Sequence, residues 1–89
     1  MAETLQGALT LDTLPALLGR STALCATGTL DLSGVTRADS AGLAFLLWLQ
    51  RQATAEGRPL RFAGAPAQLR GLADFLGLRS LLSLDTTDV

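Results

Sequence analysis

One stretch decides the fold: it runs Leu30-Asp31-Leu32-Ser33-Gly34-Val35-Thr36-Arg37-Ala38-Asp39-Ser40-Ala41-Gly42-Leu43. Leucines on one side and Asp31 on the other predict a strand over residues 29–33. Gly34 and the polar residues 36–39 predict a loop. A helix is expected next, with Asp39 or Ser40 as its cap, because short polar side chains accept hydrogen bonds from the first free N–H groups. The stretch therefore predicts a strand, a loop and a helix in succession.

This helix is expected to run to about Glu56. Gly57 is a typical helix stop, and Pro59 cannot continue a helix. Apolar residues recur along it at helical spacing, which predicts a stripe that packs on a sheet. That stripe consists of Gly42, Phe45, Leu46, Leu49 and Ala53, with Leu43 at its side.

Strands and helices also alternate on both sides of this stretch. The expected elements are a strand over residues 4–9, one helix over 14–24, a strand over 60–63, a helix over 66–76 and a last short strand or helix over 80–84. Gly19 is a weak point in the first of these helices, because glycine costs about 1 kcal/mol relative to alanine. Such alternation predicts the α/β class, with a small, partly parallel sheet covered by helices.

Length and composition narrow the function. The chain has 89 residues and a formal net charge of −1, so we expect one domain over residues 1–89. A nucleic-acid binder would carry a basic excess, which excludes that class. The longest apolar run, residues 41–49, is far shorter than the roughly 18 residues of a membrane-spanning helix, so no membrane insertion is expected. No signal-peptide pattern is present, and we expect a cytoplasmic protein.

The sequence lacks the usual parts of an active site or a metal site. It has no histidine, no lysine and a single cysteine, Cys25, which removes histidine-based catalysis, histidine metal sites and lysine-containing phosphate loops. Asp31 and Asp39 could form a carboxylate pair, but no nucleophile or base accompanies them. We therefore expect a non-catalytic protein with no cofactor and no metal, and we expect Cys25 to be a small buried apolar residue.

The central stretch resembles the STAS domain, which sulfate-transporter tails and anti-sigma-factor antagonists share. The resemblance is carried by the Asp-Leu-Ser of residues 31–33 and the Asp-Ser-Ala-Gly-Leu of residues 39–43. Residues 40–49 and 9–15 are similar to the MlaB-type subgroup, small cytosolic subunits of phospholipid-transporting ABC complexes. The resemblance covers residues 5–84 and implies a STAS fold, a small mixed sheet of about four strands with helices packed on it.

The first part of the chain departs from the family pattern. STAS domains usually begin with two strands, but this chain has room for only one before its first helix. A missing edge strand exposes the backbone of the next strand. A partner, or a second copy in a homodimer, would then cover that edge.

By the same resemblance, Ser40 is the regulatory position, which in the family carries an often phosphorylated Ser or Thr. The helix dipole favours a phosphate there, whereas the neighbouring Asp39 would repel it. The alternative is that the Ser40 hydroxyl only caps the helix. Trp48 is either an interface anchor or is folded over the edge of the core. The expected partner-binding residues are Arg37, Asp39, Ser40, Ala41, Ala44, Leu47, Trp48 and Arg51.

Two functions follow from the resemblance. The first is an accessory subunit that binds the cytosolic ATPase of a phospholipid-trafficking ABC transporter and is held at the inner membrane through that complex. The alternative is an anti-sigma-factor antagonist that a partner serine kinase regulates by phosphorylating Ser40. An enzyme or a nucleotide-binding protein is disfavoured, because histidine, lysine and a glycine-rich phosphate loop are missing.

Overall fold

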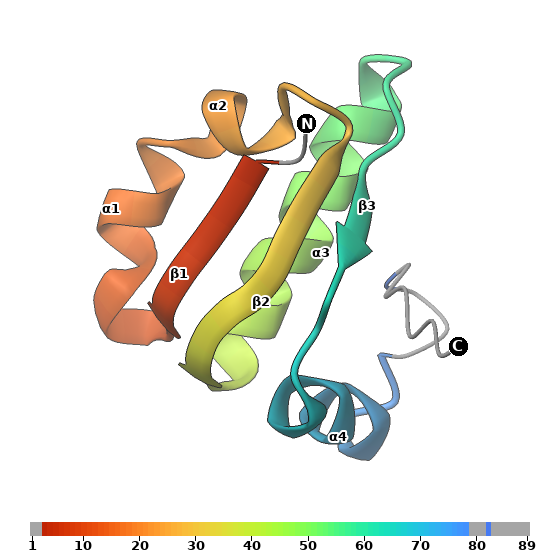
Figure 1. Ribbon diagram of the computed structural model, residues 1–89. Helices are drawn as coiled ribbons and strands as arrows, with labels where there is room; N and C mark the ends of the chain where they lie inside the picture. Colours follow the sequence, from red (N-terminus) through yellow and green to blue (C-terminus); the bar gives the residue numbers. More distant parts are fainter. Residues whose placement is uncertain (1–2, 79–81, 83–89) are drawn as a thin grey trace.

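Strands and helices alternate along the chain, as the computed structural model shows for residues 3–78 and Leu82 (Figure 1). The elements are β1 (Glu3–Leu9), the short 3-10 helix η1 (Leu11–Thr13), α1 (Leu14–Leu18), α2 (Ser21–Cys25), β2 (Thr29–Ala38), α3 (Ser40–Ala55), β3 (Arg61–Ala63) and α4 (Ala67–Phe75). The predicted α/β class is confirmed. None of the described helices is long and apolar enough to cross a membrane.

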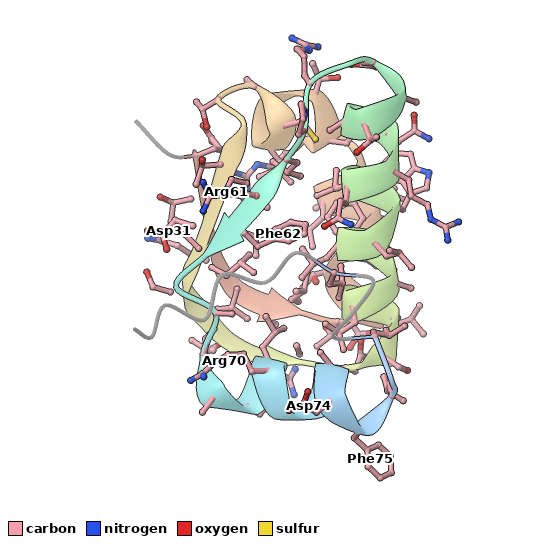
Figure 2. All side chains as sticks on the ribbon, turned by 90° about the vertical axis from the view of Figure 1, so that its right-hand side faces the viewer. Asp31, Arg61, Phe62, Arg70, Asp74 and Phe75 are labelled. Atoms are coloured by element: carbon pink, nitrogen blue, oxygen red, sulfur yellow. The ribbon has the colours of Figure 1, made fainter. Side chains whose placement is uncertain are left out.

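Within the described residues, the sheet has three strands, all parallel, in the order β1-β2-β3. The helix α3 covers one face, and Phe62 points into the space between the sheet and α3 (Figure 2). Asp31 and Arg61 lie on the opposite face, which none of the described helices covers. The strand count differs slightly from the expected four, and the described strands are all parallel rather than mixed. The element expected over residues 80–84 lies outside the described residues, apart from the buried Leu82.

The loop predicted over residues 36–39 is wrong, because β2 continues as a strand to Ala38. Its register against β1 shifts twice, and each shift inserts one extra residue of β2. The bulges change which residues face the core, so that the next buried residue after Leu32 is Val35. In the first bulge, the Asp31 carboxylate accepts a hydrogen bond from the Ser33 backbone N–H at 2.9 Å. Bulges therefore interrupt the alternation from which strands are predicted.

The single helix predicted over residues 14–24 is also wrong, because the chain forms α1 and α2 with a break at Gly19 and Arg20. The weakness predicted at Gly19 is confirmed by this break. Both short helices still bury one leucine each, Leu17 in α1 and Leu24 in α2. Tertiary packing therefore holds the segment in place although neither helix is long enough to be stable alone.

The predicted apolar stripe of α3 is confirmed. Its buried residues are Gly42, Leu43, Phe45, Leu46, Leu49 and Ala53. The helix ends where expected, with Gly57 in the left-handed region at φ 75°. There Gly57 N–H donates to Thr54 O and Arg58 N–H donates to Ala53 O, both at 2.9 Å. These bonds satisfy carbonyl groups that the last helical turn leaves free.

Two contacts fix the start of α3 against the rest of the fold. A Cβ on Gly42 would lie 2.7 Å from the backbone carbon of Leu9, so only glycine lets α3 approach β1 this closely. From the other side, the Gln68 side chain of α4 accepts from Ala38 N–H and donates to Ala38 O, each at 3.1 Å. The start of α3 is therefore held against β1, and the end of β2 just before it is held by α4.

Candidate docking face

Asp39 links the end of β2 to the start of α3 and caps the helix. Its backbone is extended, and its carboxylate accepts hydrogen bonds from Gly42 N–H at 2.9 Å and from Leu11 N–H at 3.1 Å. These two bonds, first the one from Gly42 and then the one from Leu11, lower the pKa of Asp39 below its ordinary value. Of the two predicted caps, Asp39 is the one used, and its side chain also ties η1 to α3.

Ser40 is the first residue of α3 and is exposed. Because Asp39 supplies the cap, the alternative that the Ser40 hydroxyl caps the helix is wrong. Within the described residues 3–78 and 82, the Ser40 hydroxyl makes no hydrogen bond. It is therefore open to contact or modification, although the Asp39 carboxylate beside it would repel a phosphate.

Four exposed residues follow one another along the solvent side of α3. Ser40, Ala44 and Trp48 are four positions apart, and Arg51 lies one turn beyond Trp48. Residues at this spacing share a helix face, and the row spans about 16 Å at 1.5 Å per residue. We call Ser40, Ala44, Trp48 and Arg51 the docking row.

The other predicted partner-binding residues lie around this row. Ala41 and Leu47 are half-buried on α3, and Arg37 is exposed at the end of β2. Asp39 is half-buried and already bonded to backbone groups of η1 and α3. The structure therefore brings the predicted residues to one helix and the strand end before it, and leaves Asp39 a mainly structural role.

Trp48 combines both environments predicted for it. Its ring stacks on the buried Phe45, with ring centroids 6.1 Å apart and planes inclined by 23°. The residue nevertheless keeps 40% of its surface exposed. A large aromatic ring that is held on one side and open on the other is well suited to anchor a partner, because little conformational freedom remains to be lost on binding.

Leu11 is a further exposed apolar residue, near the start of α3, that the sequence pattern did not single out. Leu11 is 67% exposed, and its backbone N–H is held by the same Asp39 carboxylate that caps α3. The exposed leucine therefore lies beside the start of the docking row. No sequence signal separates it from the core leucines around it, because its exposure follows from the 3-10 turn of η1.

A hollow of about 280 Å³ lies between α2 and α3, on the side of Trp48. Cys25, the last residue of α2, lines it and is half-buried rather than buried as expected, because its side chain borders this open hollow. Burial raises the pKa of the Cys25 thiol, and Glu56 adds to the rise while Arg58 opposes it. The thiol sulfur lies 4.0 Å from the carbonyl oxygen of Leu49.

The two aspartates of the central stretch serve local structure. Asp31 lies on the open face of the sheet and bonds Ser33, which lowers its pKa. Asp39 lies at the start of α3, so the two carboxylates hold different backbone segments. Among residues 3–78 and 82, no group of His, Cys, Asp and Glu is placed to hold a metal ion.

Comparison with known proteins matches nearly the whole chain to one family. The family model described as "Mlab, STAS domain" matches residues 4–83. No curated protein matches the chain. The matched range includes every strand and helix described above except the first residue of β1.

Proposed function

The chain belongs to the MlaB-type STAS-domain family, and we propose that it is a non-catalytic subunit that binds the cytosolic ATPase of an Mla-type phospholipid-trafficking ABC transporter. STAS domains act through protein interactions, so the question is which partner this one binds. Binding would support assembly or activity of the transporter. It would also hold the chain at the cytoplasmic side of the inner membrane, without insertion into the bilayer.

The observation that carries this proposal is the docking row. It presents the exposed Ser40 and the 40% exposed Trp48 on one helix. Alanine at position 44 between them lets a partner helix approach closely, because it has almost no side chain. Trp48 would be the anchor, and Arg37 and Arg51 would supply charges at the rim, where they steer a partner that carries acidic groups.

The first experiment is a pull-down of the tagged chain from its own cell lysate, with the bound proteins identified by mass spectrometry. Recovery of an ABC-transporter ATPase together with its permease would support the proposal. Recovery of neither would contradict it. The recovered ATPase is then purified for affinity measurements with variants of the chain.

Trp48→Glu tests the anchor. We expect the variant to keep the circular dichroism spectrum of the wild type and to bind the ATPase at least about 30-fold more weakly, which is a loss of about 2 kcal/mol. Gln6→Glu is the control, because it adds the same charge at an exposed position of β1, outside α3. If Trp48→Glu unfolds the chain, Trp48 is a core residue and the anchor must be sought elsewhere.

Ser40 is tested by a pair of substitutions. Ser40→Thr keeps the hydroxyl and should bind the ATPase like the wild type. Ser40→Asp removes the hydroxyl and places a second carboxylate beside Asp39, so it should disrupt docking. Equal affinity of the two variants would show that the partner does not contact Ser40.

The exposed position of Ser40 at the start of α3 also favours a second candidate, an anti-sigma-factor antagonist. A serine kinase would bind the same face and release the chain after phosphorylating Ser40. The adjacent Asp39 counts against this candidate, because it repels the added phosphate. Recovery of a serine kinase without transporter subunits in the same pull-down would select it.

A further inference from the structure

We propose that the outer edge of β1, together with α1 beside it, binds one extended segment of another protein, which adds a strand to the sheet. The segment pairs with backbone groups of β1 and places uncharged apolar side chains on α1. This site lies on different elements from the docking row of α3, so the inference goes beyond the proposed function and does not depend on the partner of that row.

The direction of the β1 backbone groups can be read from its two ends. Successive residues of a strand turn their N–H and C=O groups to opposite sides. At the start of β1, Glu3 N–H donates to Thr27 Oγ1, just before β2, at 3.3 Å. At its end, Leu9 O accepts from Asp39 N–H, just after β2, at 3.2 Å. The odd-numbered residues of β1 therefore face β2, and the even-numbered residues face outward.

The outward backbone groups of Thr4 and Gln6 are open. Within the described residues 3–78 and 82, no hydrogen-bond partner is found for them. Ala8 differs, because its carbonyl oxygen accepts from the Thr13 hydroxyl at 3.0 Å. Thr4 and Gln6 thus each offer one N–H donor and one C=O acceptor. An extended segment of about three to five residues satisfies all of these groups.

The edge of β1 also lacks the features that protect a sheet from strand addition. Natural sheets protect their edges with charged residues, proline or very short strands. The other outer strand of the described sheet, β3, is three residues long, begins with the exposed Arg61 and lies just after Pro59. In contrast, β1 is seven residues long, and its residues 4–9 include no charge and no proline. The missing charge favours an uncharged segment.

The helix α1 supplies an apolar surface beside this edge. All five of its residues are apolar, yet only Leu17 is buried. Pro15, Ala16 and Leu18 are exposed, and Leu18 keeps 48% of its surface exposed. Figure 1 shows α1 beside β1, on the side away from β2, and α1 packs against α3 in the helix layer. A strand added to β1 would therefore run over α1 and point every second side chain toward this apolar surface.

The place of α1 favours a single segment over a second copy of the chain. Two copies that paired through β1 in one continuous sheet would be related by a two-fold axis and would carry their helices on the same face. Each copy would then bring its own α1 into the layer beside the shared edge, where α1 of the other copy already lies. A segment without a helix avoids this overlap and gains the apolar contact with α1.

A peptide titration tests the site. The probe is the synthetic peptide Lys-Gly-Thr-Val-Thr-Leu-Thr-Val-Thr-Gly-Lys, in which apolar residues alternate with threonine and the end lysines keep it in solution. It is added to the isotope-labelled chain, and amide spectra are recorded by NMR. We expect the amide signals of Thr4 and Gln6 to shift and their hydrogen exchange to slow. The control peptide carries N-methyl groups on two adjacent central residues, which block pairing along both of its edges, and should leave these signals unchanged.

Two pairs of variants separate backbone pairing from side-chain contact. Gln6→Pro removes the outward N–H and should weaken peptide binding about tenfold, whereas Gln6→Ala keeps this N–H and should bind like the wild type. Leu18→Ser removes part of the apolar surface and should weaken binding about fivefold. Phe75→Ser is its control, because it removes an 85% exposed ring on α4 and should leave binding unchanged. Circular dichroism checks the fold of each variant.

Several outcomes would overturn the inference. Amide shifts that spare β1 would do so, as would equal binding by Gln6→Pro and Gln6→Ala. If Gln6→Pro unfolds the chain, the comparison of Leu18→Ser with Phe75→Ser decides instead. Analytical ultracentrifugation of the free chain tests the second copy, because a dimer that Gln6→Pro abolishes would make that copy the occupant. None of these measurements uses the ATPase, so the proposed function is tested separately.

Discussion

Gly42→Ala gives a sharp test of how α3 is seated on the sheet. A Cβ at this position would lie 2.7 Å from both the backbone carbon and the Cγ of Leu9, and closer still to the Leu9 carbonyl oxygen. To reach even 3.4 Å, the helix and strand would have to separate by at least about 0.7 Å. The obstacle is mostly backbone, which cannot rotate away as a side chain would.

The magnitude follows from two opposing effects. Overpacking of a well-packed contact costs about 1–3 kcal/mol, and a backbone obstacle places this site at the upper end. Alanine in place of glycine inside a helix raises the free energy of unfolding by up to about 1 kcal/mol. We therefore expect a net loss of about 2 kcal/mol in the free energy of unfolding. For a domain of this size, that loss lowers the midpoint of thermal unfolding by roughly 8–16 °C.

Gly71→Ala is the matched control, because Gly71 lies within α4 and a Cβ there would meet no atom within 4 Å. This variant should gain about 0.4–1 kcal/mol. Urea and thermal unfolding of both variants, followed by circular dichroism, measure the two effects. A Gly42→Ala variant as stable as the wild type would refute the close contact between α3 and Leu9.

Three further substitutions test the contacts at the two ends of α3. Hydrogen bonds lower the pKa of Asp39, so the stability they give is present above the ordinary carboxyl pKa and is lost as pH falls through the folded-state pKa. Asp39→Asn should therefore lower the midpoint of thermal unfolding at pH 7 and make that midpoint fall less steeply as the pH is lowered. An unchanged dependence of the midpoint on pH in the acid range would contradict this. Gly57→Ala forces a side chain into the left-handed region and should cost about 1 kcal/mol in urea unfolding, with no loss expected if the helix ends elsewhere. Gln68→Ala removes both bonds to Ala38 and should cost about 1–2 kcal/mol. Hydrogen exchange of the Ala38 amide should then accelerate. Unchanged protection of this amide would show that the two bonds from Gln68 are not needed to hold Ala38.

The parts of the fold that depend on local regularity could be predicted from the sequence. The buried stripe of α3, its start at Asp39 or Ser40 and its stop at Gly57 all follow from helical spacing and capping chemistry. The exposed positions of the docking row follow from the same spacing, since they lie opposite that stripe. A long, regular helix therefore reveals both its buried and its exposed side.

The parts that were missed depend on contacts between distant segments. Bulges in β2 arise from pairing with β1, and they hide the strand character of residues 34–38. The split between α1 and α2, the exposure of Leu11 and the half-buried state of Cys25 reflect how this segment packs on β1 and α3. No local pattern encodes such contacts, so the hollow beside Trp48 could only be found in three dimensions.

The bulges of β2 also decide how this sheet can be assembled. In a regular ladder, a strand that slides by two residues meets equivalent partners and keeps its side chains on the same face. Here β2 contributes more residues than β1 to the paired segment, because each bulge adds a residue of β2. A shift of register would therefore place a bulge of β2 opposite residues of β1 that pair regularly. The two strands therefore pair in one register. A foreign strand of regular geometry would not fit in place of β1.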